Sequence, residues 1–191
     1  MPLLAKDEGA NFEKPHTGMH DAVLVFVTDI GTHVEKTKWG DKAMHKVVFC
    51  WEIEQLISEG EYAGKPFMKS KQYTFTLFEK GNLSKDLESW FAKKISDETR
   101  KNGFDLETLV GRRCSLNLVE SADGKYINIG AVLPPAKDNN LVAVCKERPK
   151  WIDKLIQTSV ENNKDHSFSD GSPLPPEEFN QETQGNDGLP F

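Results

Sequence analysis

The stretch RCSLNLVESADGKYINIGA, residues 113–131, carries the strongest fold signal in this 191-residue chain. Apolar residues occupy alternate positions on both sides of Asp123-Gly124, as in strands that bury one face. An Asp-Gly pair favours the tight turn that joins two antiparallel strands, so the stretch predicts a β-hairpin. Its polar face would present Arg113, Ser115, Asn117, Tyr126 and Asn128, opposite an apolar face of Cys114, Leu116, Leu118, Ile127, Ile129 and Ala131.

Three segments before this hairpin also have the composition of strands. Residues 22–30, 45–53 and 67–78 are rich in β-branched and aromatic residues, and glycine-containing stretches separate them. The first segment ends near Gly31, and the polar residues 32–42 that follow predict a loop. We therefore expect three strands ahead of the hairpin.

Helical patterns lie between the third and fourth expected strands. Leu83, Leu87 and Trp90 recur at the spacing of one helix face and predict an amphipathic helix. Asp105 is placed to cap a second, short helix, and Gly111 is placed to end it. The sequence thus predicts a helical insertion within the β-structure.

The order of these elements predicts the fold class. Three strands, a helical insertion and two strands form the order of an OB-fold, a small five-stranded Greek-key barrel. We expect an all-β fold with minor α content, in which residues 17–135 form an OB-type barrel. Residues 1–16 predict a flexible arm, and residues 136–160 predict a linker with a short helix from Trp151 to Ile156.

Residues 161–191 differ from the rest of the chain in composition and charge. They contain seven acidic residues and one lysine, which account for the whole formal net charge of −6. The other 160 residues carry 23 basic and 23 acidic side chains. The segment has few aliphatic residues, so it cannot bury enough apolar area to offset the entropy of ordering it. We expect a disordered acidic tail.

Several classes of function are disfavoured by the composition. The three cysteines lie far apart, which predicts reduced thiols and neither a disulfide framework nor a zinc site. No apolar run approaches the roughly 20 residues of a membrane span, so we expect a soluble, cytoplasmic protein. Asp29, Glu52 and Glu54 could be imagined as metal ligands of a nuclease, but exposed strand carboxylates are usually solvated. We expect no catalytic residue, bound metal or cofactor.

Basic and aromatic residues concentrate where an OB-fold binds nucleic acid, on its second and third strands and the adjoining loops. Cations would hold phosphates, and flat rings would stack on unpaired bases. Trp39, Tyr73 and Tyr126 are the stacking candidates, whereas the parity of Trp51 predicts a core position. The candidate DNA-binding residues are Lys36, Lys38, Trp39, Lys42, Lys46, Lys69, Lys71, Tyr73, Lys80, Arg112, Arg113 and Tyr126.

The last residues form a second candidate site. An acidic segment without a core needs no apolar ending, yet the sequence closes with Asp187-Gly188-Leu189-Pro190-Phe191. Such an ending can enter a small apolar pocket of a partner while a basic residue there pairs with the terminal carboxylate. The acids would steer its approach to a basic surface. The candidate partner-binding residues are Asp187, Leu189, Pro190 and Phe191.

Two resemblances accompany these residues. The ending is similar to the acidic tip of bacterial single-stranded DNA-binding proteins, although Asn186 and Gly188 dilute the acidic run. Over about residues 17–134, the chain resembles a family of phage-encoded OB-fold single-strand binders. The segments that carry this likeness are TDIGT (28–32), WEIE (51–54), KSKQYTFTLFEKGNLSKDLESW (69–90), GFDLETLVGRRCSLNLV (103–119) and GKYINI (124–129). The resemblance implies a role in phage DNA replication and recombination, coating single strands beside a recombinase, helicase or polymerase.

The sequence therefore favours a sequence-tolerant binder of single-stranded DNA in the cytoplasm of a bacterial host. Its acidic tail, tethered beside a basic groove, could also occupy that groove as a mimic of nucleic acid. The alternative is an OB-type protein-interaction module that binds a host or phage replication protein without binding DNA, which the zero net charge of residues 1–160 favours. The helix around Trp151 could pack on its own barrel or on a second copy, as in a homodimer.

Overall fold

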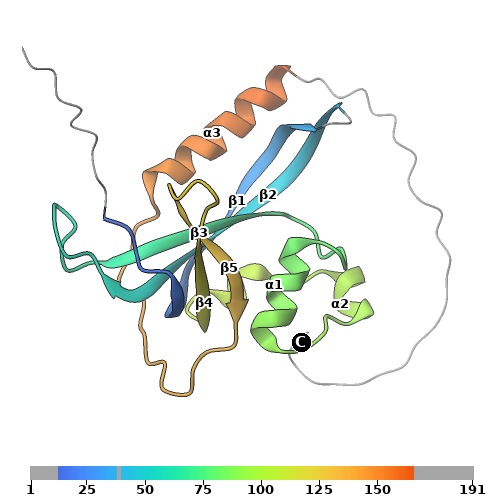
Figure 1. The fold of residues 1–191 in the computed structure, drawn as a ribbon. Helices are drawn as coiled ribbons and strands as arrows, with labels where there is room; N and C mark the ends of the chain where they lie inside the picture. The colour runs from blue at the N-terminus through green and yellow to red at the C-terminus, as the bar shows by residue number, and fades with distance from the viewer. Residues whose placement is uncertain (1–12, 38–39, 166–191) are drawn as a thin grey trace, which may run out of the picture.

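The computed structural model describes residues 13–37 and 40–165. The five strands form one sheet in the order β3-β2-β1-β4-β5, and every neighbouring pair is antiparallel (Figure 1). The predicted all-β class with minor helical content is confirmed. Along the chain the elements are β1 (Gly18–Thr37), β2 (Gly40–Leu56), β3 (Pro66–Thr74), α1 (Asn82–Phe91), α2 (Asp97–Asn102), the 3₁₀ helix η1 (Leu106–Leu109), β4 (Arg113–Glu120), β5 (Ile127–Leu133) and α3 (Lys150–Asp165).

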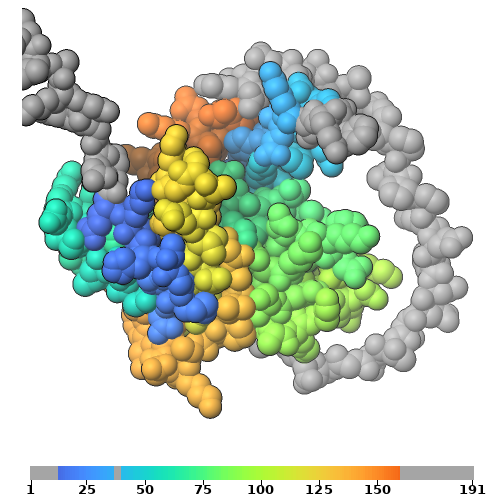
Figure 2. All heavy atoms as spheres, in the orientation of Figure 1, coloured from blue at the N-terminus to red at the C-terminus, as the bar shows by residue number. Residues whose placement is uncertain are grey.

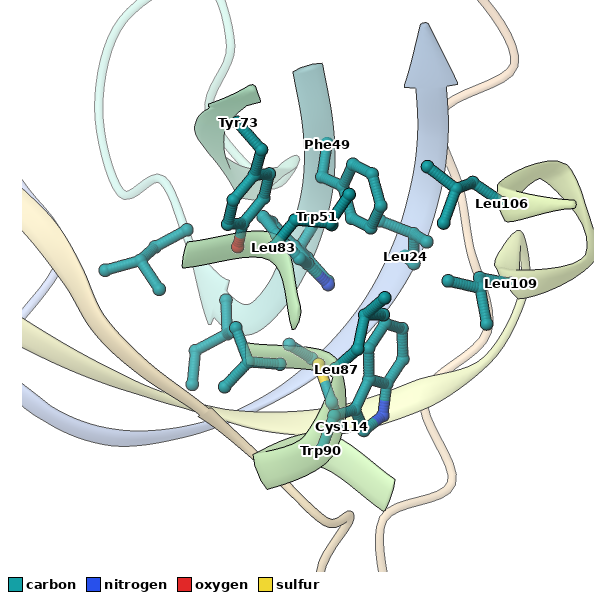
Figure 3. Packing of buried hydrophobic residues seen from close by; sticks show 14 of the residues in the cluster. Leu24, Phe49, Trp51, Tyr73, Leu83, Leu87, Trp90, Leu106, Leu109 and Cys114 are labelled. Carbon is teal, nitrogen blue, oxygen red and sulfur yellow. The ribbon is translucent and has the colours of Figure 1, made fainter. Parts of the chain in front are cut away.

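The main hydrophobic core joins the sheet to the helical segment between β3 and β4 (Figure 3). Leu83 and Leu87 of α1 share one buried cluster with Phe49 and Trp51 of β2. Full burial of a large apolar side chain contributes roughly 1.5–3 kcal/mol, so these contacts fix α1 on the sheet. The prediction that Trp51 belongs to the core is confirmed.

The opposite face of the sheet is covered by α3, which lies along β1 in Figure 1. Ile152 of α3 is fully buried against Ile30, Val48 and Cys50. Val48 and Cys50 alternate with the core residues of β2, so this strand is buried on both faces. Of the two packings considered for this helix, the structure shows α3 on its own sheet.

Residues 31–37 and 40–46 form a two-stranded extension that we call the hairpin arm. The prediction of a loop over residues 32–42 is wrong, because β1 and β2 stay paired as far as Thr37 and Gly40. The arm extends beyond the main core and has no apolar alternation, so its sequence lacks the usual signal of a strand. Pairing of the two strands still satisfies the backbone hydrogen-bonding groups.

The β4–β5 hairpin is confirmed, with one change in register. The pairing shifts between Asn117 and Leu118, where Gly130 forms a bulge. Beyond this bulge Val132, which is 1% exposed, takes the core position predicted for Ala131. A bulge of one residue reverses which side chains face inward, and strict alternation cannot predict it.

The helices predicted within residues 83–110 are present with small shifts. The carboxylate of Asp105 caps η1 by accepting a hydrogen bond from Glu107 N at 2.9 Å. The short polar helix α2, capped by Ser96, was not predicted because it lacks an apolar stripe. In the ranges that the structure describes, no helix combines the length and the apolar character needed to cross a membrane.

Residues 134–149 connect β5 to α3 and are bound to the sheet, although the sequence predicts a linker here. The Asn139 amide donates to Cys114 O at 3.0 Å. The buried carboxylate of Glu52 accepts hydrogen bonds from Val144 N at 2.7 Å and from the next backbone amide at 2.6 Å. These bonds lead the chain to the position from which α3 packs on β1.

Candidate nucleic-acid interface

Strand β3 forms one edge of the sheet and carries an exposed polar row. Ser70, Gln72 and Thr74 are exposed and alternate with residues that face the core side. Gln72 is paired with Val48, so the row lies on the face of the sheet that α3 covers further along. The surface predicted on the second and third strands is therefore reduced to β3 and its flanks.

Two hollows flank this row, one at each end of β3. The first, which we call the seam pocket, lies between β3 and β5 and has a volume of about 620 Å³. The second, of about 310 Å³, lies between the end of β3 and the helical segment. The path from Ser70 to Phe75 spans about 17 Å at the rise of a strand. In Figure 2 the loop between β4 and β5 (yellow) stands on one side of this surface and the hairpin arm (light blue) on the other.

The seam pocket is lined by three lysines and a tyrosine, Lys14, Lys69, Lys125 and Tyr126. Lys14 Nζ donates to Gly124 O at 3.1 Å, which ties the start of the described chain to the β4–β5 loop. Lysine ammonium groups attract phosphate, and an aromatic ring offers a stacking face for a base. The pocket therefore has the chemistry of a nucleotide site.

The acid at this pocket, Glu13, is directed to other partners. Its carboxylate accepts hydrogen bonds from Ser58 N at 2.8 Å and from Glu59 N at 3.4 Å. The backbone hydrogen bond from Ser58 lowers the pKa of Glu13, so this carboxyl group stays ionised. Its oxygen is engaged by the two backbone amides and not by a lysine of the pocket. His16 N also donates to Gln55 Oε1 at 2.8 Å. Residues 13–16 of the predicted flexible arm are thus docked beside the pocket.

Lys69 bridges the two edge strands of the sheet. Its ammonium group donates to Ile127 O on β5. Burial lowers the pKa of Lys69, because desolvation disfavours the charged form. Among the residues that the structure describes, Lys69 forms no ion pair with a carboxylate. A half-buried cation without a counter-charge is stabilised when an anion binds beside it.

The loop that carries Tyr126 is held by its own hydrogen bonds. Asp123 Oδ1 accepts from Ser121 Oγ at 2.6 Å and from Lys125 N at 3.2 Å. The bond from the Ser121 hydroxyl is the main reason that the pKa of Asp123 is lowered. Tyr126 N donates to Ser121 Oγ at 2.9 Å, while the side chain of Tyr126 is 65% exposed. A fixed backbone therefore presents a ring to solvent.

The second hollow also combines a ring with a cation. Phe75 is 45% exposed, and its ring meets His45 of the hairpin arm edge-on with centroids 5.2 Å apart. Arg100 donates to Glu88 Oε1 at 2.8 Å, so its charge is compensated inside the protein. Lys101 is exposed at the rim and is the cation available to a ligand.

The hairpin arm contributes part of the predicted basic surface. Lys36 and Lys42 are exposed on its two strands. Lys46 is half-buried and forms an ion pair with Glu35, so its charge is partly compensated. Six candidates lie outside the described residues: Lys38, Trp39, Asp187, Leu189, Pro190 and Phe191.

The prediction that Tyr73 stacks on a base is wrong. Its side chain is 3% exposed, and its ring packs edge-on against Phe49 with centroids 5.2 Å apart (Figure 3). Its hydroxyl donates to Asp86 Oδ2 at 2.7 Å. Burial, with Asp86 adding to the effect, raises the pKa of Tyr73 well above its usual value, so the phenol stays neutral. Tyr73 is a core residue.

Two other basic candidates, Lys71 and Arg112, are engaged by partners inside the protein. Lys71 Nζ lies 2.6 Å from Asp86 Oδ2 in an ion pair. Arg112 lies over the ring of Phe91 at 5.7 Å. Lys80, by contrast, is exposed in the turn after β3.

Arg113 is a structural residue of the connecting segment. Its guanidinium donates to Leu141 O at 3.0 Å and to Asn139 O at 3.1 Å, which holds residues 134–149 in place. Ser115, expected beside it on an open polar face, is buried. The predicted polar face of the hairpin is therefore divided: Arg113 and Ser115 are engaged or buried within the protein, whereas Tyr126 and Asn128 are exposed.

The acidic residues considered as metal ligands do not converge. Glu52 is buried and bonded to backbone amides, Glu54 lies 2.9 Å from the ring of His20, and Asp29 lies 2.7 Å from the ring of His45. Among the described residues, no group of three or more ligating side chains is placed to hold a metal ion. Each carboxylate thus has a local partner of its own.

Four residues of this interface were not predicted: Lys14, Phe75, Lys101 and Lys125. Lys14 lies in a segment without any strand or helix pattern, and Lys101 belongs to the unpredicted α2. Phe75 follows the last residue of β3, where the alternation of an expected longer strand places it with the core. Of these four residues, Lys125 could have been predicted from the sequence, because it is a basic residue directly before the predicted stacking residue Tyr126.

No family model matches the chain, and no curated protein is significantly similar to it. The functional argument therefore depends on the arrangement of the residues.

Proposed function

We propose that this protein binds single-stranded DNA in a sequence-tolerant way, using an OB-type barrel in which β3 and its two flanking hollows form the binding surface. The observation that carries this proposal is the combination of cations and exposed rings at both ends of one polar edge strand. Phosphates need positive charge, and unpaired bases need flat apolar faces at intervals along the path.

The sheet order supports an OB-type barrel. In an OB-fold the first strand pairs with the second and fourth, and the helix lies between the third and fourth strands. Here β1 pairs with β2 and β4, and the helices lie between β3 and β4. The bond from Lys69 of β3 to Ile127 O of β5 joins the two edges that a barrel would bring together.

The charges available to a ligand support an anionic partner such as nucleic acid. The exposed cations on this surface include Lys36 and Lys42 on the hairpin arm, Lys14 and Lys125 at the seam pocket and Lys101 at the second hollow. Each phosphate that they neutralise releases counter-ions, so the logarithm of the association constant should fall by about 0.7 per unit of log salt concentration for each contact.

A titration with labelled oligonucleotides tests the proposal. An oligothymidine of about 30 residues is longer than the roughly 4–16 nucleotides that one OB-fold covers. We expect salt-dependent binding to this oligonucleotide and weaker binding to a duplex of the same length. Equal affinity for both, or no binding at low salt, contradicts the proposal. Metal-dependent loss of the oligonucleotide would indicate a nuclease instead.

The same proposal extends to partners. Residues 187–191 combine an acid, Leu189, Pro190 and Phe191, a set suited to an apolar pocket with a basic rim on a replication or recombination protein. We expect Phe191→Ala to abolish capture of such a partner and to leave the affinity for the oligothymidine unchanged. Capture that depends on Phe191 in a protein that binds no oligonucleotide supports the interaction module instead.

A further inference from the structure

We propose that the seam pocket takes one nucleotide turned out of the bound strand, with its base against Tyr126 and its phosphate between Lys69 and Lys125. This inference rests on the proposed single-strand binding and assigns it an anchoring site. A base of a single strand can enter such a pocket once it leaves the stack of its neighbours, because it has no pair to break.

The size and lining of the pocket suit a nucleotide. Its volume of about 620 Å³ falls within the roughly 300–1,000 Å³ of small-ligand sites. The walls come from Met68 and Ser70 of β3 and from Asn128 of β5, so apolar, hydroxyl and amide groups are all within reach of a base. A mixed lining of this kind fits an aromatic heterocycle better than a purely apolar ligand.

The charge of the pocket is not balanced by its own acid. Lys14, Lys69 and Lys125 line it, and none of them forms an ion pair with a carboxylate in the described part of the chain. Glu13 is bonded to the amides of Ser58 and Glu59. A phosphate would supply the counter-charge that the half-buried Lys69 lacks, which strengthens a charge-assisted contact.

The pocket is also organised before a ligand arrives. The side chain of Asp123 fixes the turn through Ser121 and the backbone of Lys125, and Lys14 fixes Gly124. Figure 2 shows this loop (yellow) standing beside the N-terminal part of the described chain (dark blue). Because the loop needs little ordering on binding, more of the stacking free energy contributes to affinity.

A photocrosslink tests the location directly in the full-length protein. The probe is the oligothymidine with one internal thymidine replaced by 5-iododeoxyuridine, and the adduct is mapped by mass spectrometry. We expect the main adduct on Tyr126. Adducts found only on the hairpin arm or at Phe75, in a protein that binds the oligonucleotide, overturn the pocket and leave the proposed function standing. If the protein binds no oligonucleotide, the proposed function itself is contradicted.

Matched variants test the roles of ring and charge. Tyr126→Ala should weaken oligothymidine binding on the order of tenfold, and Tyr126→Phe should retain it, because the ring face makes the stack. Tyr62→Ala is the control, since Tyr62 is 55% exposed in the turn between β2 and β3 and does not line the pocket. Equal affinities of the Tyr126→Ala and Tyr62→Ala proteins overturn the inference.

Lys69→Met tests the phosphate contact. It should reduce the slope of log affinity against log salt by about 0.7, the contribution of one phosphate on a single strand. Lys137→Met, at an exposed lysine outside the pocket, should leave the slope unchanged. An unchanged slope in the folded Lys69→Met protein contradicts the assigned contact.

Discussion

Two tyrosines show how the environment of a residue decides its role. Tyr73 and Tyr126 are both aromatic residues in basic stretches of sequence, and both were expected to stack on bases. The structure buries Tyr73 against Phe49 and leaves Tyr126 65% exposed on a fixed turn. Only Tyr126 offers a ring to a ligand, so the two side chains should respond differently to substitution.

Replacing Tyr73 with phenylalanine should change stability and leave DNA binding intact. The variant loses the hydrogen bond to Asp86, while Lys71 still balances that carboxylate. A hydrogen bond to a charged group is worth about 1.5–3 kcal/mol, so we expect a loss near the lower end of this range in chemical denaturation. If the Tyr73→Phe protein has unchanged stability but a weakened affinity for oligothymidine, Tyr73 contacts the DNA and its assignment to the core is contradicted.

The three cysteines should differ in reactivity. Burial raises the pKa of Cys50 to about 12, and it raises the pKa of Cys114 still further, so both thiols stay protonated at neutral pH. The thiolate is the reactive form, and Cys145 is the thiol at the surface. A thiol reagent at pH 8 should modify one cysteine in the native protein and three after denaturation. Rapid native modification of Cys50 would show that α3 leaves the sheet readily.

The alternation of residues along a strand predicted correctly which face some side chains occupy, and it failed for others for identifiable reasons. It placed Trp51 in the core and Tyr126 outside, because both lie beside regular alternation. It failed at Tyr73 because Lys69 and Lys71 lie on the same side of β3 as Tyr73, and lysines usually mark the exposed side of a strand. Lys69 and Lys71 lie on the inner side of β3 but reach acceptors at its margin, Ile127 O and Asp86. Their charge therefore suggested that this side of the strand faces outward, although the exposed row of β3 is on the other side.

At the scale of elements, segments with a core-facing side were the predictable ones. The β4–β5 hairpin and α1 bury apolar faces and were expected from their periodicity. The hairpin arm and α2 bury little and gave no periodic signal. The packing of α3 on β1 was one of two alternatives, since an amphipathic helix does not specify its partner.

Gly31 allows α3 to lie close to β1, and its substitution should separate them. Gly31 has φ of +76°, and an added Cβ would lie 2.2 Å from Ser159 Oγ of α3. We expect Gly31→Ala to destabilise the protein by about 1–3 kcal/mol through backbone strain and overpacking. Hydrogen exchange of residues 150–159 should become faster than in the parent protein.

Ser159→Gly in the Gly31→Ala background separates the two causes. The second change removes the clash with the helix but leaves the strained φ, so it should restore part of the lost stability and the slow exchange of α3. A double variant as unstable as Gly31→Ala would show that the close approach contributes nothing.

At the scale of the whole molecule, net charge conceals an uneven distribution. Residues 166–191 contain five acidic residues and no lysine or arginine. The composition of the sequence predicted that the acidic tail begins at residue 161, but α3 extends to Asp165. A truncation that ends the chain after Asp165 therefore preserves the helix. The element order was predictable from the sequence at this scale. The covering of β2 by α3, which leaves β3 as the strand for the proposed interface, was not.

Truncation after Asp165 should tighten binding to the oligothymidine several-fold at low salt, because a tethered acidic segment competes for the same cations. The difference should shrink as salt is added. A full-length variant with amides at the five acidic positions Asp170, Glu177, Glu178, Glu182 and Asp187 should match the truncated protein. Unchanged or weaker affinity after truncation rules out competition by this segment.

The central claim is that β3, with a hollow at each end, is the surface that contacts DNA. Hydrogen exchange measured by mass spectrometry, with and without saturating oligothymidine, tests it most directly. The account predicts slower exchange in residues 69–76 and 121–128 and in the hairpin arm, with residues 150–159 of α3 unaffected. Protection confined to α3 and residues 134–149, in a protein saturated with oligonucleotide, would place the DNA on another surface and contradict the account.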